Sequence, residues 1–186
     1  MLDRVRCERP RKVPKNAARP ALPAGLNPMV GIKLWENPCW LSFRVNYISH
    51  HYNQPLYAWI WQRYKLNNPE HVVLYAIGLK DGITADDIAA SSARPKNTLS
   101  RAVNSLLRKK LISRSQDERD RRRFGLHLTA RGQKIVDETV PAFVAQEQAM
   151  FETLNKEERR TLHALLTKIV LGAGGWPAKI ERETTR

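Results

Sequence analysis

The side chains best suited to chemistry form a run of seven charged residues at 117–123. Guanidinium groups neutralise phosphates and hydrogen-bond to base edges, so the arginines of this run are predicted to contact DNA. These arginines are Arg119, Arg121, Arg122 and Arg123. An isolated charged run is more often a solvated loop, and the neighbouring segments decide between the two interpretations.

Short segments in which apolar and polar residues alternate flank the run at 111–115 and 124–128. This pattern predicts two β-strands, so the charged run becomes the tip of a hairpin. Just upstream, a helix is predicted over 95–110, with Pro95 at its first position, where a missing N–H costs nothing. The predicted apolar stripe of this helix consists of Leu99, Ala102, Val103 and Leu106.

The opposite face of this helix presents side chains that can hydrogen-bond to base edges and phosphates. They are Lys96, Asn97, Thr98, Ser100, Arg101 and Asn104. They gather toward the N-terminal half, which is the end that a recognition helix usually directs into the major groove. The alternative interpretation is a polar surface without a partner. A short helix that begins with the capping-box spacing of Thr84 and Asp87, followed by a turn at 91–93, completes a predicted helix-turn-helix.

Longer helical patterns surround this unit. Helices are predicted over 38–66, 69–79, 130–154 and 156–171. Pro55 is expected to kink or split the first of these, Thr129 to cap the third, and Pro141 to bend it. A compact DNA-binding unit does not need the apolar stripes of the first helix and the last two, so these stripes are expected to pack against a second copy. This predicts a homodimer whose two-fold symmetry matches a pseudo-palindromic duplex site.

The positive charge is local. Of the formal net charge of +14, residues 1–33 hold eight basic residues against two acidic ones, and residues 94–123 hold eleven against three. The remaining stretches are nearly neutral. A local excess of positive charge favours a binding face for a polyanion over a general effect on solubility.

The 186 residues are enough for one domain with tails. A basic, Pro-rich disordered tail is expected at 1–33, a domain at 38–172 and a frayed tail at 173–186. Within the domain, the DNA-binding lobe is expected at 68–129 and the dimerisation helices at 38–66 and 130–172. Met29 would also serve as a start, in which case 1–28 would not be part of the native protein. Two cysteines and the lack of an apolar run long enough to cross a membrane predict a soluble, cytoplasmic protein that associates with the nucleoid when bound to DNA.

Several short motifs occur in a fixed order. They are Ile88-Ala89, then Asn97-Thr98-Leu99-Ser100-Arg101-Ala102-Val103, Leu111-Ile112, Asp117-x-Arg119-Asp120-Arg121-Arg122 and Leu126-x-Leu128-Thr129-x-x-Gly132. On these residues the sequence resembles the MarR (multiple antibiotic resistance regulator) family of bacterial winged-helix transcription factors over about residues 40–170. The resemblance implies a mostly α fold with a small β-wing, in which the helices at both ends form the dimerisation region.

The resemblance further implies a homodimer that represses or tunes transcription from double-stranded DNA. Its recognition helices would lie in successive major grooves, and its wing arginines would reach the minor groove. Asp117 and Asp120 match positions that would orient a wing arginine by ion pairing. One departure is Lys110, because many members carry glycine just after the recognition helix. A residue with a Cβ in that left-handed position costs about 1 kcal/mol, which leaves room for a different turn into the wing.

Nine of the fourteen aromatic residues lie between 35 and 64. Packing in the core and the dimer is one interpretation. The other is an effector pocket, which in similar proteins lies near the first helix. The predicted lining is Tyr47, His50, His51, Tyr57 and Trp61. Aromatic rings and polar donors of this kind suit a small aromatic acid or phenol.

Other classes of function have less support. Hydroperoxide-sensing relatives keep a reactive cysteine near the start of the first helix, but Cys39 stands about one turn too early and Asn68 replaces an expected tyrosine. The histidines lack metal-ligand spacing, and no phosphate-binding loop, nucleophile elbow or paired carboxylates occur, so neither a metal, a cofactor nor an enzymatic activity is expected. The rival from another class is an architectural protein that binds DNA through charge alone.

Overall fold

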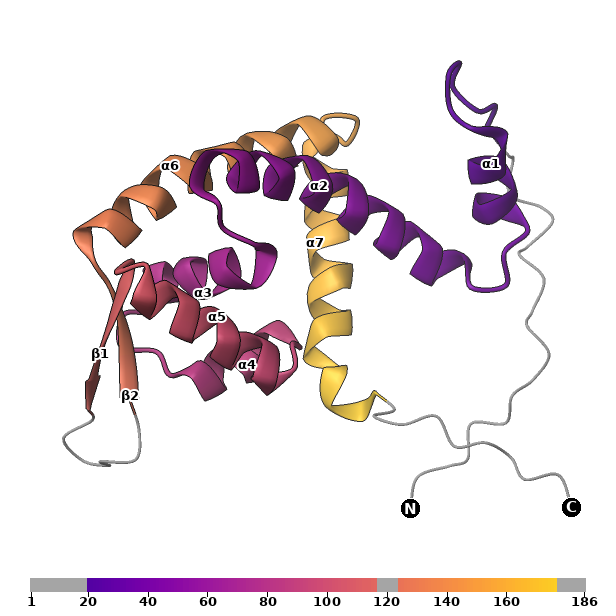
Figure 1. Cartoon of the computed structure of the whole chain (residues 1–186). Coiled ribbons are helices and arrows are strands. Elements are labelled where there is room, and N and C mark those ends of the chain that lie inside the picture. The colour runs from indigo at the N-terminus through magenta and orange to yellow at the C-terminus, as the bar shows by residue number, and fades with distance from the viewer. Residues whose placement is uncertain (1–19, 117–123, 177–186) are drawn as a thin grey trace, which may run out of the picture. The chain divides into compact units, whose positions relative to one another are not determined.

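A helix-turn-helix and a two-stranded hairpin occupy the middle of the chain, with longer helices before and after them (Figure 1). The computed structural model describes residues 20–116 and 124–176. The elements are α1 (Pro28–Trp35), α2 (Trp40–Tyr64), α3 (Asn68–Leu79), α4 (Ala85–Ser92), α5 (Lys96–Arg108), β1 (Ile112–Gln116), β2 (Phe124–Leu128), α6 (Ala130–Met150), α7 (Lys156–Leu171) and the 3₁₀ turn η1 (Ala173–Gly175). The predicted fold class, mostly α with a small β-wing, is confirmed.

The chain forms two compact units, Met1–Val140 and Pro141–Arg186, which are described separately. The first contains all the elements from α1 to β2. The second contains the end of α6 and all of α7.

Capping residues set the starts of the short helices. The Thr84 hydroxyl accepts from the Asp87 N–H at 3.2 Å, and the Asp87 carboxylate accepts from the Thr84 N–H, so the predicted capping box is confirmed. Helix α4 continues to Ser92, slightly beyond the expected end, and Ala93 then takes the left-handed conformation with φ 53°. Asn67 and Glu70 form a second capping box at α3 that the sequence analysis did not identify.

Helix α5 follows the turn, and its amphipathic pattern is as predicted. Leu99, Ala102, Val103 and Leu106 are all buried. Pro95 is the N-cap residue and not the first helical residue. The helix ends where Lys110 takes the left-handed conformation with φ 56° and the Leu111 N–H donates to the Leu106 carbonyl at 3.0 Å. The backbone therefore accepts lysine where the resemblance leads us to expect glycine.

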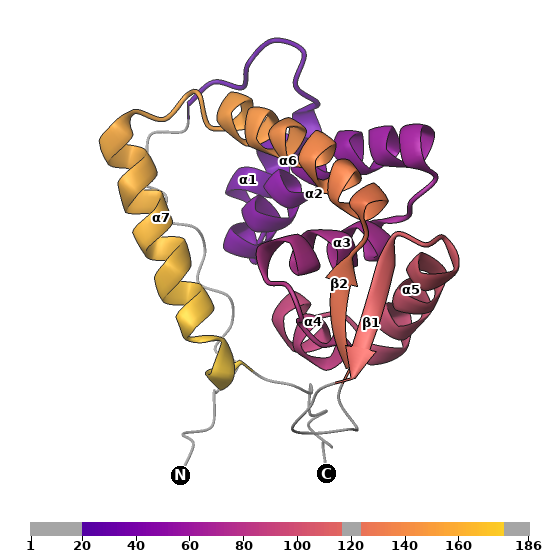
Figure 2. The same cartoon turned by 90° about the vertical axis from the view of Figure 1, so that its left-hand side faces the viewer.

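The two predicted strands form an antiparallel hairpin, seen face-on in Figure 2 with α5 beside β1. The register runs from Ile112 opposite Leu128 to Gln116 opposite Phe124, so residues 117–123 connect the two strands. The predicted contact residues Arg119, Arg121, Arg122 and Arg123 and the orienting residues Asp117 and Asp120 lie outside the described residues.

Thr129 and Gly132 explain why α6 starts directly after the hairpin. The Thr129 hydroxyl accepts from the Gly132 N–H at 3.2 Å, which confirms the predicted cap, and it lies 3.1 Å from the Leu111 carbonyl oxygen. A Cβ on Gly132 would lie 2.0 Å from that same oxygen. Only glycine lets the first turn of α6 approach the residue directly before β1 this closely.

The core of the first unit joins α2 to the winged lobe. Leu56 and Ile60 of α2 are buried, as are Val73, Leu74 and Ile77 of α3. Helix α2 runs through Pro55 as one helix, so the split that Pro55 allowed does not occur. Proline removes one backbone hydrogen bond of the helix, and Leu56 and Ile60, which follow it, are buried.

Helix α1 lies partly inside the segment predicted as a disordered tail, so that prediction is wrong for residues 28–33. Asn27 accepts a hydrogen bond from the Met29 N–H, and Pro28 occupies the first turn, which together form a helix start signal. A Cβ on Gly31 would clash with Leu22, which shows how closely the preceding chain packs on α1.

In the second unit, Asn155 and Glu158 form a capping box at the start of α7. The apolar stripe of α7 leaves large hydrophobic side chains exposed within the described part of the chain: Leu165, Leu166, Ile169, Val170 and Leu171. This stripe is the one expected to pack against a second copy. No helix among the described residues is both long and apolar enough to cross a membrane.

Candidate DNA-binding surface

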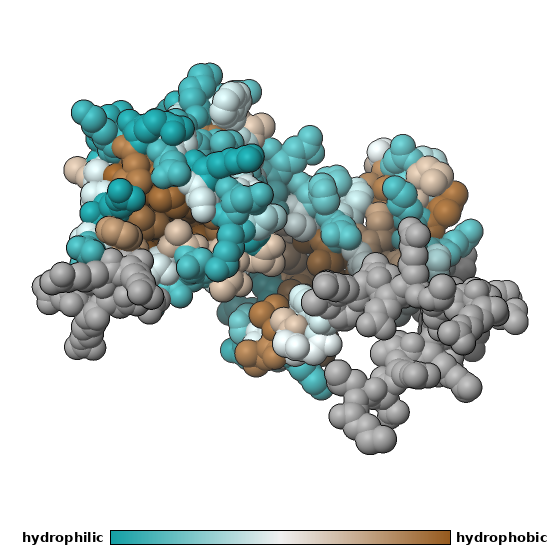
Figure 3. All heavy atoms as spheres, turned by 60° about the horizontal axis from the view of Figure 1, so that its bottom comes forward, coloured by the Kyte–Doolittle hydropathy of each residue, from teal (hydrophilic) through white to brown (hydrophobic). Residues whose placement is uncertain are grey.

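The outer face of α5 brings together the polar residues predicted for DNA recognition. Lys96, Asn97, Ser100, Arg101 and Asn104 are exposed, and Thr98 is half-buried. The buried stripe of the same helix fixes which side points outward. In the view of Figure 3, hydrophilic residues surround a smaller hydrophobic area over the winged lobe.

Some of these side chains already have local partners. The Lys96 Nζ lies 2.8 Å from an Asp86 carboxylate oxygen, and both side chains are highly exposed. Such a pair contributes at most about 1 kcal/mol, so the ammonium group can exchange it for a phosphate. The Ser100 hydroxyl donates to the Lys96 carbonyl at 2.9 Å and keeps its acceptor capacity for a ligand.

Arg114 is an exposed arginine on β1 that the sequence analysis did not select. Its guanidinium carbon lies 5.1 Å from the centre of the Phe124 ring on β2, in cation–π geometry. Alternation along strand 112–116 would not have identified it as a surface residue, because Arg114 lies two residues after the buried Ile112 and opposite the buried Leu126.

Glu70 fixes the recognition helix against α3. Only 2% of its side chain is exposed, and it accepts hydrogen bonds from the Asn67 N–H at 2.8 Å, the Ser105 hydroxyl at 2.6 Å and the Lys109 Nζ at 2.7 Å. Burial raises the pKa of the carboxyl, but the hydrogen bonds and the positive charge of Lys109 outweigh burial and hold the pKa below its ordinary value. The spacing of Asn67 and Glu70 is a sequence signal for the capping box but not for the contacts of Glu70 with Ser105 and Lys109.

An open pocket of about 290 Å³ lies between α2 and the turn before α5. Its lining is Ser49, His50, Asn53, Gln54, Tyr57, Asn68 and Arg94. The Arg94 guanidinium donates to the Asn68 side-chain oxygen. Burial raises the pKa of Tyr57, and the positive charge of Arg94 partly offsets this effect. The pocket therefore combines one cationic group with a phenol and an imidazole.

The structure brings only two of the five predicted effector residues to this pocket, His50 and Tyr57. Tyr47 and His51 stack on each other along α2 with ring centres 4.0 Å apart, and neither lines the pocket. Trp61 is exposed one turn beyond Tyr57 and does not line it either. Sequence reasoning missed Asn68 and Arg94, which reach the pocket from the start of α3 and from the turn before α5.

Two minor hypotheses involve other residues. Cys39 is exposed at the N-cap position of α2. Asn68, which stands where a redox sensor of this kind is expected to have tyrosine, is bonded to Arg94. Within residues 20–116 and 124–176, no three His, Cys, Asp or Glu side chains come together in an arrangement that could hold a metal ion.

A helix-turn-helix followed by a two-stranded hairpin, with a polar recognition face on α5, defines the winged helix-turn-helix class of DNA-binding proteins. The family model of the MarR family matches residues 64–123, which span α3 to the end of the charged run. Together with the relatives described next, this match shows that the chain belongs to the MarR family.

The similar proteins come from several bacteria. The HTH-type transcriptional regulator BilQ of Clostridium symbiosum is 30% identical over 99 residues, which cover 53% of this chain and 68% of BilQ. MepR of S. aureus, solved in complex with DNA, is 32% identical with a TM-score of 0.61, covering 71% of this chain and 95% of MepR. BpsR of Bordetella bronchiseptica, whose DNA binding is regulated by 6-hydroxynicotinic acid, is 28% identical with a TM-score of 0.54, covering 68% of this chain and 98% of BpsR. The chain is therefore similar to DNA-binding transcription regulators.

Proposed function

We propose that this protein is a repressor that binds a pseudo-palindromic duplex as a homodimer and is released by a small aromatic effector. The observation that carries the proposal is the exposed face of α5, which presents amide, hydroxyl and guanidinium groups. This helix is followed directly by the β1–β2 hairpin, and the segment that joins the two strands contains four arginines. In this arrangement the helix reads base edges, and the arginines of 119–123 add phosphate or minor-groove contacts.

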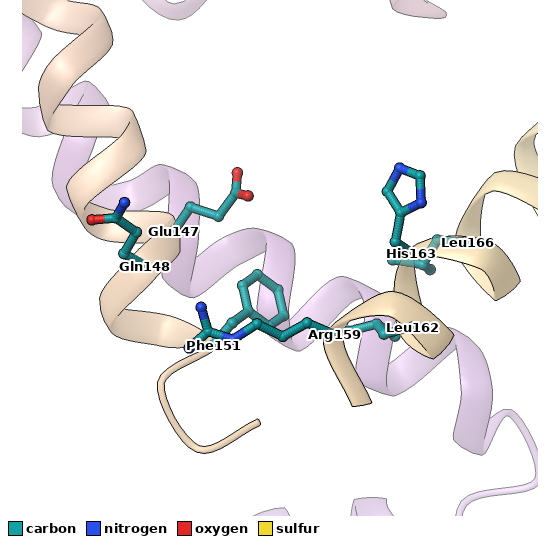
Figure 4. A pocket seen from close by; sticks show the side chains of 7 residues that line it. All are labelled: Glu147, Gln148, Phe151, Arg159, Leu162, His163 and Leu166. Atoms are coloured by element: carbon teal, nitrogen blue, oxygen red, sulfur yellow. The ribbon is translucent and has the colours of Figure 1, made fainter. Parts of the chain in front are cut away.

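The exposed apolar stripe of α7 supports a homodimer. A related feature occurs at the turn before α7, where Phe151, Leu162 and Leu166 line a hollow of about 210 Å³ whose polar residues include Glu147 and Arg159 (Figure 4). Large apolar side chains gathered on one exposed helix face are typical of an interface. On size-exclusion chromatography with light scattering, the wild-type chain should have twice the monomer mass, and Ile169→Asp should have the mass of a monomer. A monomeric wild-type protein at micromolar concentration would contradict this part of the proposal.

The pocket around Arg94 supports a small effector with an acidic group. Tyr57 offers an aromatic face, Arg94 a cation, and His50 a hydrogen-bonding ring at the same opening. The regulation of BpsR by a hydroxylated aromatic acid agrees with this chemistry. A thermal-shift series of hydroxybenzoates and hydroxynicotinates should therefore stabilise the wild type and should not stabilise Arg94→Ala. An equal shift in both proteins would place the ligand elsewhere.

Selection of bound sequences from a random duplex library tests the proposal as a whole. The selected site should contain two inverted half-sites whose centres lie one or more helical turns apart, and it should bind two chains. In competition, it should bind about 10³-fold or more tightly than random duplex. An architectural protein would enrich no motif and would show little preference, and this result would overturn the proposal.

The charged run contributes to affinity in a way that salt titration measures. Arg121→Ala should weaken binding and reduce the magnitude of the slope of log K against log salt by about 0.9. The variant makes one phosphate contact fewer, so its binding releases fewer counterions. An unchanged slope would remove Arg121 from the DNA contact.

A further inference from the structure

His127 of β2 joins three segments of the chain. Its Nε2 lies 2.8 Å from the Ser115 hydroxyl of β1, and its Nδ1 lies 2.9 Å and 3.0 Å from the two carboxylate oxygens of Asp81, which follows α3. One imidazole ring thus connects both strands of the hairpin to the loop between α3 and α4.

Backbone hydrogen bonds connect the same loop to β2. The Gly82 N–H donates to the Leu126 carbonyl, and the Leu126 N–H donates to the Ile83 carbonyl, both at 3.0 Å. The 82–83 segment therefore pairs with β2 on the edge opposite β1. Gly125 permits this approach, because a Cβ there would lie 3.1 Å from the Gly82 carbonyl oxygen. The hairpin is therefore held, through β2, to the loop between α3 and α4.

A Ser–His–Asp series with these distances also resembles the arrangement of a hydrolytic triad, but its environment does not fit. A triad carboxylate is buried, so that it holds the imidazole in one orientation in a dry site. Here 75% of the Asp81 side chain is exposed, and so is 32% of the His127 side chain. The arrangement is therefore suited to holding the hairpin in place.

We propose that His127, through Asp81 and Ser115, is a positioning residue for DNA binding. It sets the direction in which the hairpin leaves the winged lobe, and so the place at which residues 117–123 meet the duplex. The proposal rests on the proposed function, because it assigns a role within DNA binding to residues that do not themselves contact DNA.

The bridge does not depend on one charge state. The neutral ring donates from Nδ1 to Asp81 and accepts at Nε2 from the Ser115 hydroxyl, whereas the imidazolium donates to both partners. Exchanging the ring for a methyl group removes the hydrogen bonds to Asp81 and Ser115. The backbone hydrogen bonds of Gly82 and Ile83 do not involve this ring, so we expect the variant to keep its fold.

The test is a double-mutant cycle on the full-length protein with its selected duplex. His127→Ala should weaken binding about fivefold, since an exposed pair of this kind transmits only a modest free energy. In the Arg121→Ala background, the same change should weaken binding by no more than about twofold, because a positioning residue acts through the arginines that it positions. A general loss of structure would instead multiply the two effects.

Matched variants separate the contributions. Ser115→Ala should show a smaller loss of the same kind. Ser113→Ala, on the same strand and opposite His127 in the register, removes no side-chain hydrogen bond to His127 among the described residues and should bind as the wild type does. Wild-type affinity in His127→Ala, or full multiplication with Arg121→Ala, would overturn the positioning role. A wild-type protein that shows no preference for any selected duplex would instead overturn the proposed function, and with it the positioning role that rests on it.

Discussion

Replacing Glu70 tests how the recognition helix is fixed to the winged lobe. In Glu70→Gln the side chain keeps nearly the same shape, and its amide oxygen still accepts from the Asn67 N–H. The variant loses the charged interactions with the Ser105 hydroxyl and the Lys109 ammonium group at 2.6 Å and 2.7 Å. Since Glu70 is buried, water cannot replace these two partners without opening the contact between α3 and α5.

The expected loss follows from these contacts. A hydrogen bond to a charged group contributes about 1.5–3 kcal/mol. The contribution of Lys109 is discounted because 36% of its side chain is exposed and the ammonium group can turn to water. Glu70→Gln should therefore lower the free energy of unfolding by about 2 kcal/mol, and Glu70→Ala by about 3 kcal/mol, because alanine also removes the capping box.

The pH dependence gives an independent readout. The pKa of Glu70 in the folded protein lies below its ordinary value of 4.5. The carboxylate therefore stabilises the fold above the unfolded-state pKa, and this contribution is lost as the pH falls through the lower, folded-state pKa. The difference in unfolding free energy between wild type and Glu70→Gln should be full at pH 7 and should shrink as the pH falls below 4.5.

Urea unfolding of both proteins between pH 3.5 and pH 7 measures this difference. Glu158→Gln is the matched control, because Glu158 has the same capping-box position on α7 but is exposed, and its substitution should cost less than about 0.5 kcal/mol. Equal stability of Glu70→Gln and wild type at pH 7, or a difference that does not change with pH, would refute the reasoning.

Two further predictions concern the joints around α6. Gly132→Ala should destabilise the protein by more than about 3 kcal/mol or prevent folding, because its Cβ would lie 2.0 Å from the Leu111 carbonyl oxygen. Gly174 has open space around it, so Gly174→Ala should leave the stability unchanged in the same urea titration. His71 of α3 is buried, and its Nε2 lies 3.0 Å from the Thr139 hydroxyl of α6. Burial lowers the pKa of His71 to about 4, so the unfolded state binds the proton first as the pH falls from 6.5. Stability should therefore decrease by about 3 kcal/mol between pH 6.5 and pH 4, and His71→Gln should remove that slope; a slope that persists in the variant would assign it to other groups.

The sequence was sufficient for the parts of the fold that depend on local patterns. The buried stripe of α5, the capping box at Thr84 and the two strands around the charged run follow from periodicity and from residues adjacent in the chain. The Thr129 cap is a local signal of the same kind, whereas the need for glycine at 132 comes from its approach to the Leu111 carbonyl oxygen. These features made the winged helix-turn-helix recognisable before any distance was known.

Contacts between distant segments could not be predicted in the same way. Glu70 meets Lys109 across 39 residues, and His127 meets Asp81 across 46. The pocket at Arg94 likewise combines α2, α3 and the turn before α5, so the aromatic content of α2 alone predicted only part of its lining. Composition also failed at residues 28–33, where a cap and a proline start a helix within a segment that is otherwise Pro-rich and basic.

The central claim is that the exposed face of α5 reads base sequence, and the most direct measurement compares two affinities for one variant. Arg101→Ala should bind the selected duplex roughly 5- to 150-fold more weakly than the wild type does, which corresponds to about 1–3 kcal/mol for a base contact. Its affinity for random duplex should change far less. An equal loss on both duplexes would assign Arg101 to phosphate contact alone and would contradict the account of α5 as the recognition helix.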